Sequence, residues 1–406
     1  MPAENRTLAI VLLTTLTGWI GFSLPFPIFS HIFLNPEHGI VDPNMPETWR
    51  TALMGGALAI YPLGQVIGSP VLGRLSDRLG RKRVLVWSLW GTVFGSLVLA
   101  FGVAAGSVLL IYLGRLLSGF AEGSLAIAQS IAADISTSKT KARNFAYIGI
   151  AIDVGFIVGP LLGGLLSDPA LHPVFNAALP FWTACLLFAI NAVLVWTLLK
   201  EPAPVEASAV QQRGVLKTFL DRRMLPGFIL SFLVFWAIMI FFDFFAVYFV
   251  QVFQTPPAEL GIYTALISLP LIISGLVVGN VIARIGVCPT GIISVLLMGS
   301  GTLLFLGFDS IAGLVFPIIV ICIGINFGQT ATSVTVSDAA AEGEQGQAMG
   351  VYRAVTVAAG GFSALAGGFL AGYAPSYPFV TAILASLGAF GLLLMGTVFQ
   401  TSRQRA

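Results

Sequence analysis

The sequence predicts an all-α membrane protein in which twelve transmembrane helices form two pseudo-symmetric six-helix bundles. Of its 406 residues, 57% are hydrophobic and only 9% are charged, and the mean hydropathy is +0.93. A soluble domain carries about 25% charged residues. Apolar stretches of about 20 residues, enough to cross a bilayer as a helix with a rise of about 1.5 Å per residue, recur along the whole chain. This composition excludes an ordinary soluble protein.

Twelve apolar stretches define the predicted helices. Six precede a long polar region: 8–34, 49–75, 84–105, 107–136, 144–168 and 178–199. Six follow it: 224–254, 258–284, 289–308, 311–338, 347–372 and 376–400. The first run is too long for the apolar part of a cleavable signal, and no small-residue cleavage site stands out after it. We therefore expect it to remain as a helix.

The polar region between the two sets reads as a linker. It continues from Lys200 with Glu-Pro-Ala-Pro and later contains Gln-Gln-Arg-Gly, a composition typical of loops. We therefore expect an N-terminal six-helix bundle at 1–199, a cytoplasmic linker at 200–223 and a C-terminal six-helix bundle at 224–406.

A weak internal repeat supports two homologous halves. Three sequence features of the first half recur in the second half after nearly the same number of residues. They are Gly73-x-x-x-Asp77-Arg78-x-Gly80 with Gly279-x-x-x-Ala283-Arg284-x-Gly286, Asp134 with Asp338, and Gly163-Gly164 with Gly367-Gly368. Repeated halves of this kind place a substrate site near the bilayer midplane, between bundles that rock against each other. We expect a substrate site in that position.

The distribution of Lys and Arg predicts the orientation. With both termini in the cytoplasm, nearly all basic residues fall on the inner side, whereas Arg50 lies at the outer face. Arg115 and Arg353 lie within helices. This asymmetry follows the positive-inside rule. Because the basic loops are short and lie at helix ends, orientation explains them better than nucleic-acid binding does.

The cysteines and histidines indicate no metal, cofactor or catalytic site. Three cysteines lie in or beside different apolar runs without paired spacing: Cys185, Cys288 and Cys322. The three histidines fall near the outer side, and no nucleophile, metal-ligand or phosphate-loop pattern occurs. We therefore expect neither an enzyme nor an ATP-driven pump.

A dense charged loop separates the second and third apolar runs. Its spacing, G-x-x-x-D-R-x-G-R-K-R, resembles the signature loop between helices two and three of the major facilitator superfamily of secondary transporters. The resemblance implies that Asp77 caps the helix starting near Gly346 and that Arg81 pairs with Asp134. These contacts would gate the cytoplasmic side through Gly73, Asp77, Arg78, Gly80, Arg81 and Asp134. The alternative is a loop that only fixes topology, which leaves its aspartate and glycines unexplained.

The predicted helix 107–136 carries two charges inside the membrane. Arg115 and Gly119 form an R-x-x-x-G pattern that resembles the family's conserved one, whose arginine is linked to proton coupling. A mid-membrane arginine is costly, which makes it a functional candidate. Glu122 lies two turns further on, on the same helical face and about 10 Å along the axis. The alternative for both is an ion pair with another helix that serves assembly only.

The predicted helix 144–168 contains Gly155-Phe-Ile-Val-Gly159-Pro160-Leu-Leu-Gly163-Gly164, which resembles the antiporter motif of proton-coupled drug exporters. Glycines four residues apart form a strip that admits another helix closely, and the proline removes a backbone donor. The resemblance implies that the strip packs against the eighth helix and limits proton leak. The alternative is ordinary helix packing.

Two further acids lie inside predicted helices. Asp153 is rotated by about 160° from the glycine strip, so it either lines the interior of the first bundle or pairs with Arg115. Asp243 lies between two pairs of phenylalanines in the predicted helix 224–254. Burial penalises the charged form of such a carboxyl, which suits proton exchange. Its aromatic neighbours suit an amphipathic or cationic ligand. The alternative is a carboxylate held by a Tyr or Gln donor.

The candidate site residues fall into two overlapping sets. Proton coupling is assigned to Asp243, Glu122, Arg115 and Asp153. Substrate binding is assigned to Asp243, Glu122, Phe242, Phe244, Gln129, Asn326, Gln329 and Arg353. Each of the uncharged polar residues taken alone also fits a helix-to-helix hydrogen bond.

Together these motifs resemble the drug:proton antiporters of the superfamily, which include tetracycline exporters. The resemblance covers nearly the whole chain and implies a monomeric, multi-pass protein of the cell inner membrane. It would export a small amphipathic compound in exchange for protons by alternating access, with no nucleic acid or cofactor involved. A facilitator or proton symporter importing a small metabolite, siderophore or nutrient shares the fold, and so does a sensor derived from a transporter.

Overall fold

The computed structural model describes residues 3–35, 40–42, 44–136, 140–201, 218–340 and 344–404. This part of the chain is helical and contains no strand. Twelve of its helical segments are long and apolar enough to cross a membrane. The predicted fold class, with twelve transmembrane helices, is therefore confirmed.

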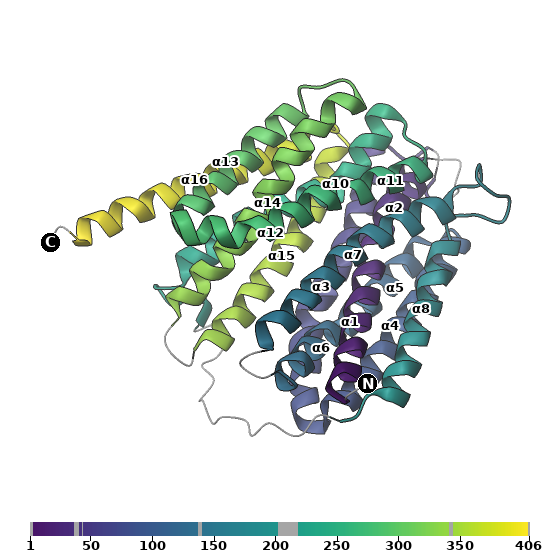
Figure 1. Cartoon of the computed structure of the whole chain (residues 1–406). Coiled ribbons are helices and arrows are strands. Elements are labelled where there is room, and N and C mark those ends of the chain that lie inside the picture. The colour runs from purple at the N-terminus through teal and green to yellow at the C-terminus, as the bar shows by residue number, and fades with distance from the viewer. Residues whose placement is uncertain are drawn as a thin grey trace. The chain divides into compact units, whose positions relative to one another are not determined.

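The described helices are shown in chain order in Figure 1. Their bounds in the first part of the chain are α1 Ala3–Ser23, α2 Pro25–Leu34, α3 Glu47–Leu79, α4 Arg81–Ala104, α5 Val108–Ala121, α6 Gly123–Asp134, α7 Lys141–Ser167 and α8 Leu179–Leu198. The second part contains α10 Leu225–Phe253, α11 Pro257–Leu266, α12 Ser268–Ile285, α13 Val287–Phe305, α14 Ile311–Ala339, α15 Gln345–Ala371 and α16 Tyr377–Gln404.

Three membrane spans, α1–α2, α5–α6 and α11–α12, each contain a short interruption between two consecutive helices. Proline explains two interruptions, because it cannot donate a hydrogen bond to the carbonyl four residues earlier. Pro25 is the first residue of α2, and Pro270 follows the interruption at Ile267. At the third, Glu122 lies between α5 and α6 with φ −68° and ψ 3°, followed by Gly123.

Matching turns support the internal repeat. Gly80 joins α3 to α4 with φ 100°, and Gly286 joins α12 to α13 with φ 87°. Glycine favours this left-handed region because it has no Cβ. Ser107 and Ser310 form a further pair, since their hydroxyls cap the first turns of α5 and α14. The two halves therefore share turn chemistry as well as sequence spacing.

The chain divides into two compact units. The first comprises residues 1–207 and 249–268, and the second comprises 208–248 and 269–406. The predicted halves differ from these units mainly in segment 249–268, which packs with the first unit. Residues 202–217 of the predicted linker lie outside the described residues.

Specific contacts hold segment 249–268 on the first unit. The ring nitrogen Nε2 of His31 lies 2.9 Å from the carbonyl oxygen of Thr255. The backbone N–H of Ala258 donates to Oδ2 of Asp168 at 3.3 Å. Together these bonds join both ends of the 255–258 turn to the helices of the first unit.

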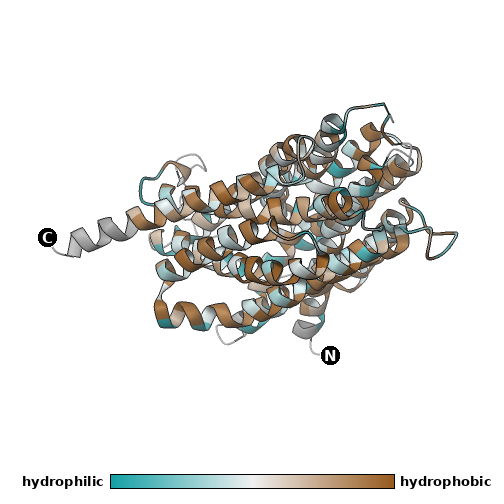
Figure 2. Cartoon of the chain, turned by 90° about the horizontal axis from the view of Figure 1, so that it is seen from above, coloured by the Kyte–Doolittle hydropathy of each residue, from teal (hydrophilic) through white to brown (hydrophobic). Residues whose placement is uncertain are grey.

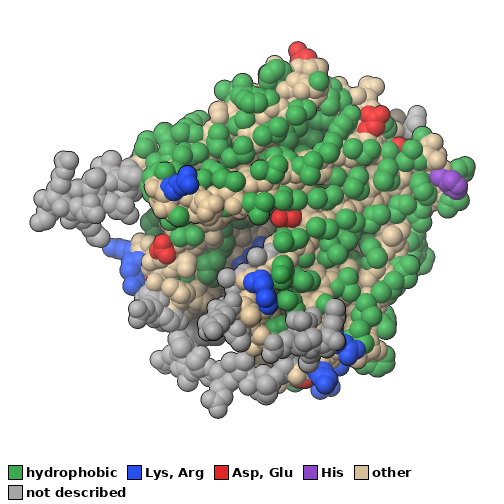
Figure 3. All heavy atoms as spheres, viewed as in Figure 1, with side chains coloured by type: hydrophobic (Ala, Val, Ile, Leu, Met, Phe, Trp, Pro, Cys, Tyr) green, Lys and Arg blue, Asp and Glu red, His purple; other side chains and the backbone are tan. Residues whose placement is uncertain are grey.

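The apolar surface of the helices is what a bilayer requires. Large hydrophobic side chains remain exposed along several spans, among them Leu109, Trp196, Ile273 and Leu276. Figure 2 shows hydrophobic residues predominating along the helices and hydrophilic residues gathering in the connections. Hydrophobic side chains also cover most of the face drawn in Figure 3, whereas most Lys and Arg side chains lie toward its margins. The chain is a multi-pass membrane protein.

Candidate functional site

Arg115 lies on α5 and is only 2% exposed. Its Nε donates to the carbonyl oxygen of Ala57 at 3.2 Å, and its Nη2 donates to that of Leu58 at 3.5 Å. The guanidinium carbon lies 4.4 Å from the ring centre of Tyr61 and 5.6 Å from that of Phe29. Backbone carbonyls and ring faces therefore stabilise the buried cation.

Glu122 occupies the interruption between α5 and α6 and is 3% exposed. A Cβ built on Gly18 of α1 would lie 2.5 Å from its Oε1, so the missing side chain of this glycine makes room for the carboxylate. The hydroxyl of Ser88 donates to the carbonyl of Ala121 at the same interruption. The carboxylate thus lies where α1 meets the broken fourth span.

Asp153 lies on α7 and is half-buried. It has no hydrogen bond or ion pair with another described residue, so the suggested pairing with Arg115 is not formed. Its place three residues before Phe156 puts the two side chains on one face of α7. The alternative that Asp153 lines the interior of the first bundle stays a prediction.

An aromatic cluster in the first unit was not identified from the sequence. Trp19 packs on Phe156 and on Phe22 at ring distances of 4.9 and 5.3 Å, and Phe22 lies 5.7 Å from Tyr61. The indole Nε1 of Trp19 is buried without a hydrogen-bond acceptor in the described part of the chain. The cluster links α1, α3 and α7, whose sequences lie too far apart for any local pattern to join them.

Asp243 lies in the second unit, on α10, and is 7% exposed. The neighbouring rings are also buried: Phe241 contacts Phe242 at 5.9 Å and Phe305 at 6.3 Å. Phe244 is fully buried, and a Cβ on Gly367 would overlap its ring. Phe244 therefore packs α10 against α15, while its predicted role toward a substrate stays a prediction.

The predicted uncharged polar residues have different surroundings. The amide Nδ2 of Asn326 donates to the carbonyl of Leu271 at 2.6 Å and to the hydroxyl of Ser274 at 2.9 Å, which joins α14 to α12. This is the helix-to-helix bond that the sequence left open as an alternative. Gln129 and Gln329 are half-buried, and Arg353 is exposed on α15.

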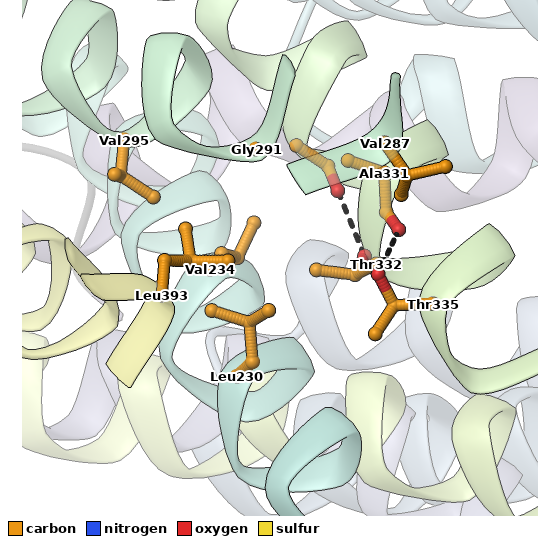
Figure 4. A pocket seen from close by; sticks show the side chains of 10 residues that line it. Leu230, Val234, Val287, Gly291, Val295, Ala331, Thr332, Thr335 and Leu393 are labelled. Carbon is orange, nitrogen blue, oxygen red and sulfur yellow. Dashed lines mark hydrogen bonds between the residues drawn. The ribbon is translucent and has the colours of Figure 1, made fainter. Parts of the chain in front are cut away.

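A small pocket lies within the second unit (Figure 4). Apolar side chains from α10, α13, α14 and α16 line it, including Leu230, Val295 and Leu393. Its polar side chains Thr332 and Thr335 donate their hydroxyl hydrogens to carbonyls of their own helix. The pocket contains none of the predicted site residues. Among the described residues, no group of three or more His, Cys, Asp or Glu is placed to hold a metal ion.

The charged loop forms the expected ion pair. Nε of Arg81 lies 2.6 Å from Oδ2 of Asp134, and its Nη1 lies 3.5 Å from Oδ1 of Asp77. Arg78 and Asp77 are exposed, and a Cβ on Gly73 would meet nothing within 4 Å. The Arg81–Asp134 contact is therefore confirmed. The predicted contact of Asp77 with the helix near residue 346 involves both units and stays a prediction.

Glu201 binds the end of the charged loop from elsewhere in the chain, a contact that sequence reasoning missed. Its Oε1 accepts a hydrogen bond from the backbone N–H of Lys82 at 3.2 Å, in the first turn of α4. A carboxylate at this position satisfies an open donor and complements the positive end of the helix. No local pattern reveals it, because the acid follows the sixth helix and the capped turn begins the third.

The glycine strip of α7 packs against the predicted eighth helix and against α1 as well. A Cβ on Gly155 would meet Trp19, and a Cβ on Gly159 would meet Ser23, both on α1. Gly164 instead faces the eighth helix, where its Cβ would lie 2.7 Å from Cα of Gly261 in α11. Gly155 and Gly159, four residues apart, lie on the side that faces α1, whereas Gly164 is rotated by about 100° from Gly163 and faces α11.

The comparisons with known proteins agree with this architecture. The family model described as Major Facilitator Superfamily matches residues 8–256 and 228–406. The tetracycline resistance protein class H of Pasteurella multocida is 32% identical over 203 residues, which cover 50% of this chain and 46% of that protein. The class G protein of Vibrio anguillarum is 29% identical over 334 residues, or 78% and 82% of the two chains. The chain thus spans about half the length of the first of these relatives.

Solved transporter structures share the fold. The nucleoside transporter NupG superposes with a TM-score of 0.73 at 18% identity, covering 98% of this chain and 99% of that one. The D-xylose-proton symporter gives 0.75 at 17% identity, covering 94% and 96%. With a family match over nearly all of its length, twelve described helical segments long and apolar enough to cross a membrane, and a fold shared with solved transporters, the chain belongs to the Major Facilitator Superfamily.

Proposed function

We propose that this protein is a secondary active transporter that exports a small amphipathic compound in exchange for protons. In this proposal both termini are cytoplasmic, the protein lies in the cell inner membrane, and transport proceeds by alternating access. The similarity to tetracycline resistance proteins supports export of a drug-like compound. The similarity of part of α7 to an antiporter motif supports the exchange for protons.

The observation that carries the proposal is a pair of buried carboxyl groups in membrane-spanning helices. Glu122 is 3% exposed and Asp243 is 7% exposed. A carboxylate held at membrane depth is costly, and acids there are typical of proton and substrate pathways. Release of a proton would restore a charge that attracts a cationic substrate group, and proton uptake would remove it. Because the proton and the substrate compete for the same carboxylate, binding of one releases the other, which is exchange of substrate for protons.

Arg81 and Asp134 are the proposed gating pair. Both side chains are partly accessible, and their atoms approach to 2.6 Å. A single ion pair of this kind contributes about 1 kcal/mol or less, which is small enough to break and reform in each cycle. Gly73, Arg78 and Asp77 complete the proposed gate around it.

Transport by purified protein in liposomes tests the proposal. With tetracycline as probe and an imposed pH gradient, the wild-type protein should exchange protons for probe. Asp243→Asn or Glu122→Gln should abolish gradient-driven flux, because neither amide releases a proton. Asp309→Asn is a matched control, since Asp309 is exposed and precedes α14. Gradient-driven flux at the wild-type rate in both buried-acid variants would eliminate the assignment.

Import is the second candidate, because structures of the nucleoside transporter NupG and of the D-xylose-proton symporter share this fold. A proton symporter would move its substrate in the same direction as protons. Reversing the imposed pH gradient in the same liposomes separates the two. Export by antiport requires probe accumulation on the side from which protons leave.

A further inference from the structure

A carbonyl group in the middle of α3 lacks its usual helical partner. In an α-helix the carbonyl of residue 58 accepts a hydrogen bond from the N–H of residue 62, but Pro62 has no N–H. Its ring also crowds that carbonyl. Pro62 lies inside a helix of 33 residues that crosses the membrane, where water is absent as a substitute partner.

Arg115 supplies a donor at this position. Its Nη2 donates to the Leu58 oxygen at 3.5 Å, and its Nε donates to the neighbouring Ala57 oxygen at 3.2 Å. The guanidinium is a planar group with five donors and no acceptor, so it can serve two adjacent carbonyls at once. The Tyr61 ring, one residue before the proline, lies 4.4 Å from its carbon and covers one face.

The packing of α5 on α3 also explains why a glycine lies four residues after Arg115. One turn beyond the arginine, a Cβ on Gly119 would overlap the carbonyl oxygen of Tyr61. The glycine therefore lets α5 approach α3 closely beside the proline. Tyr112, one turn before the arginine, donates its hydroxyl to the carbonyl of Leu53 at 2.7 Å. Three positions along α5 thus bind the backbone of α3.

We propose that Arg115 is a positioning residue that replaces the hydrogen bond removed by Pro62 and so fixes the packing of α3 on α5. This role goes beyond the proposed transport function and does not depend on it. It assigns the arginine to the helix backbone instead of to proton coupling, because two of its donors bond carbonyls of α3 and its guanidinium lies on the Tyr61 ring. The proton-coupling role then belongs to the acids.

A double-mutant cycle on the full chain tests the assignment. Arg115→Leu should lower the apparent Tm by roughly 4 °C or more, since it leaves buried carbonyls without donors. In the Pro62→Ala background, the new N–H of residue 62 serves the Leu58 carbonyl, so the same substitution should cost less than half as much. Pro70→Ala is the matched control, because Pro70 lies in the same helix two turns away. It should leave the cost of Arg115→Leu unchanged.

The outcomes are decisive even when the single variant fails to fold. If Arg115→Leu yields no folded protein alone but does so with Pro62→Ala, the proposal is supported. Equal losses in the wild-type and Pro62→Ala backgrounds, or failure to fold in both, overturn it. Arg115→Gln keeps an amide NH2 group that can donate to the carbonyls and should restore part of the Tm.

The pH profile of transport distinguishes the positioning role from a role in proton coupling, because only the second predicts that the profile depends on Arg115. In the double variant Arg115→Gln with Pro62→Ala, the pH profile of tetracycline flux should match that of Pro62→Ala alone. A shifted profile would return the arginine to proton coupling. If the protein moves no tetracycline at all, the proposed function fails while the Tm cycle still decides the positioning role.

Discussion

The space beside Glu122 gives the sharpest prediction. In Gly18→Ala the new Cβ would lie 2.5 Å from the carboxylate Oε1 and 3.7 Å from its carbon. Because ordinary contacts begin near about 3.4 Å, the oxygen has to retreat by about 0.9 Å within a buried site. Because this oxygen ends a flexible side chain, we expect a cost toward the low end of the about 1–3 kcal/mol typical of overpacking. Replacing glycine by alanine inside a helix also stabilises the helix by up to about 1 kcal/mol. A second Gly→Ala substitution, at a helical position with open space, is therefore required as a control.

Gly149→Ala is that control, since a Cβ there meets nothing within 4 Å on α7. We expect Gly18→Ala to unfold at a lower temperature than Gly149→Ala, by roughly 2–6 °C in a thermal scan of the purified protein. Glu122→Asp shortens the acid by one methylene, so it should recover part of the loss when combined with Gly18→Ala. Equal Tm values for the two alanine variants, or no recovery by the shorter acid, would refute the assigned contact.

Further predictions concern close contacts elsewhere in the first unit. Gly164→Ala should lower Tm by the equivalent of about 1–3 kcal/mol or more, because its Cβ would press on the backbone of Gly261. Gly279→Ala is the control and should be neutral or stabilising, because a Cβ there has open space around it. Equal thermal scans for the two variants would contradict the packing. Glu201→Ala should cost about 0.5–1 kcal/mol and speed hydrogen exchange at the Lys82 amide, since it removes the cap on α4. Unchanged exchange at that amide would argue against the cap.

The sequence predicted the helices well because a membrane span leaves a long apolar signal. Its interruptions were harder to place, although Pro25 and Pro270 mark two of them. The proline signal was readable, since it removes a backbone donor wherever it occurs. At Glu122 no proline is present, and the break depends on tertiary contacts to α1 and α4 that no local pattern encodes.

Helix partners could be predicted only in part from the sequence. The spacing of Gly155, Gly159 and Gly164 reveals a close approach but not the helix that makes it. The structure divides these glycines between α1 and α11, because an α-helix rotates about 100° per residue. Likewise, Pro62 was visible in the sequence, yet only the fold shows that Arg115 lies beside the carbonyl it leaves open.

The buried charges of the first unit differ in what their surroundings permit. Arg115 donates to two backbone carbonyls of α3, groups that do not exchange protons. Glu122 lies in space provided by a glycine at a break in its span, where a small shift of α1 or α6 alters its environment. Asp153 has no bond to another described residue. A group that exchanges protons needs an environment that changes with conformation, which favours Glu122 over Arg115 as the coupling site of this unit.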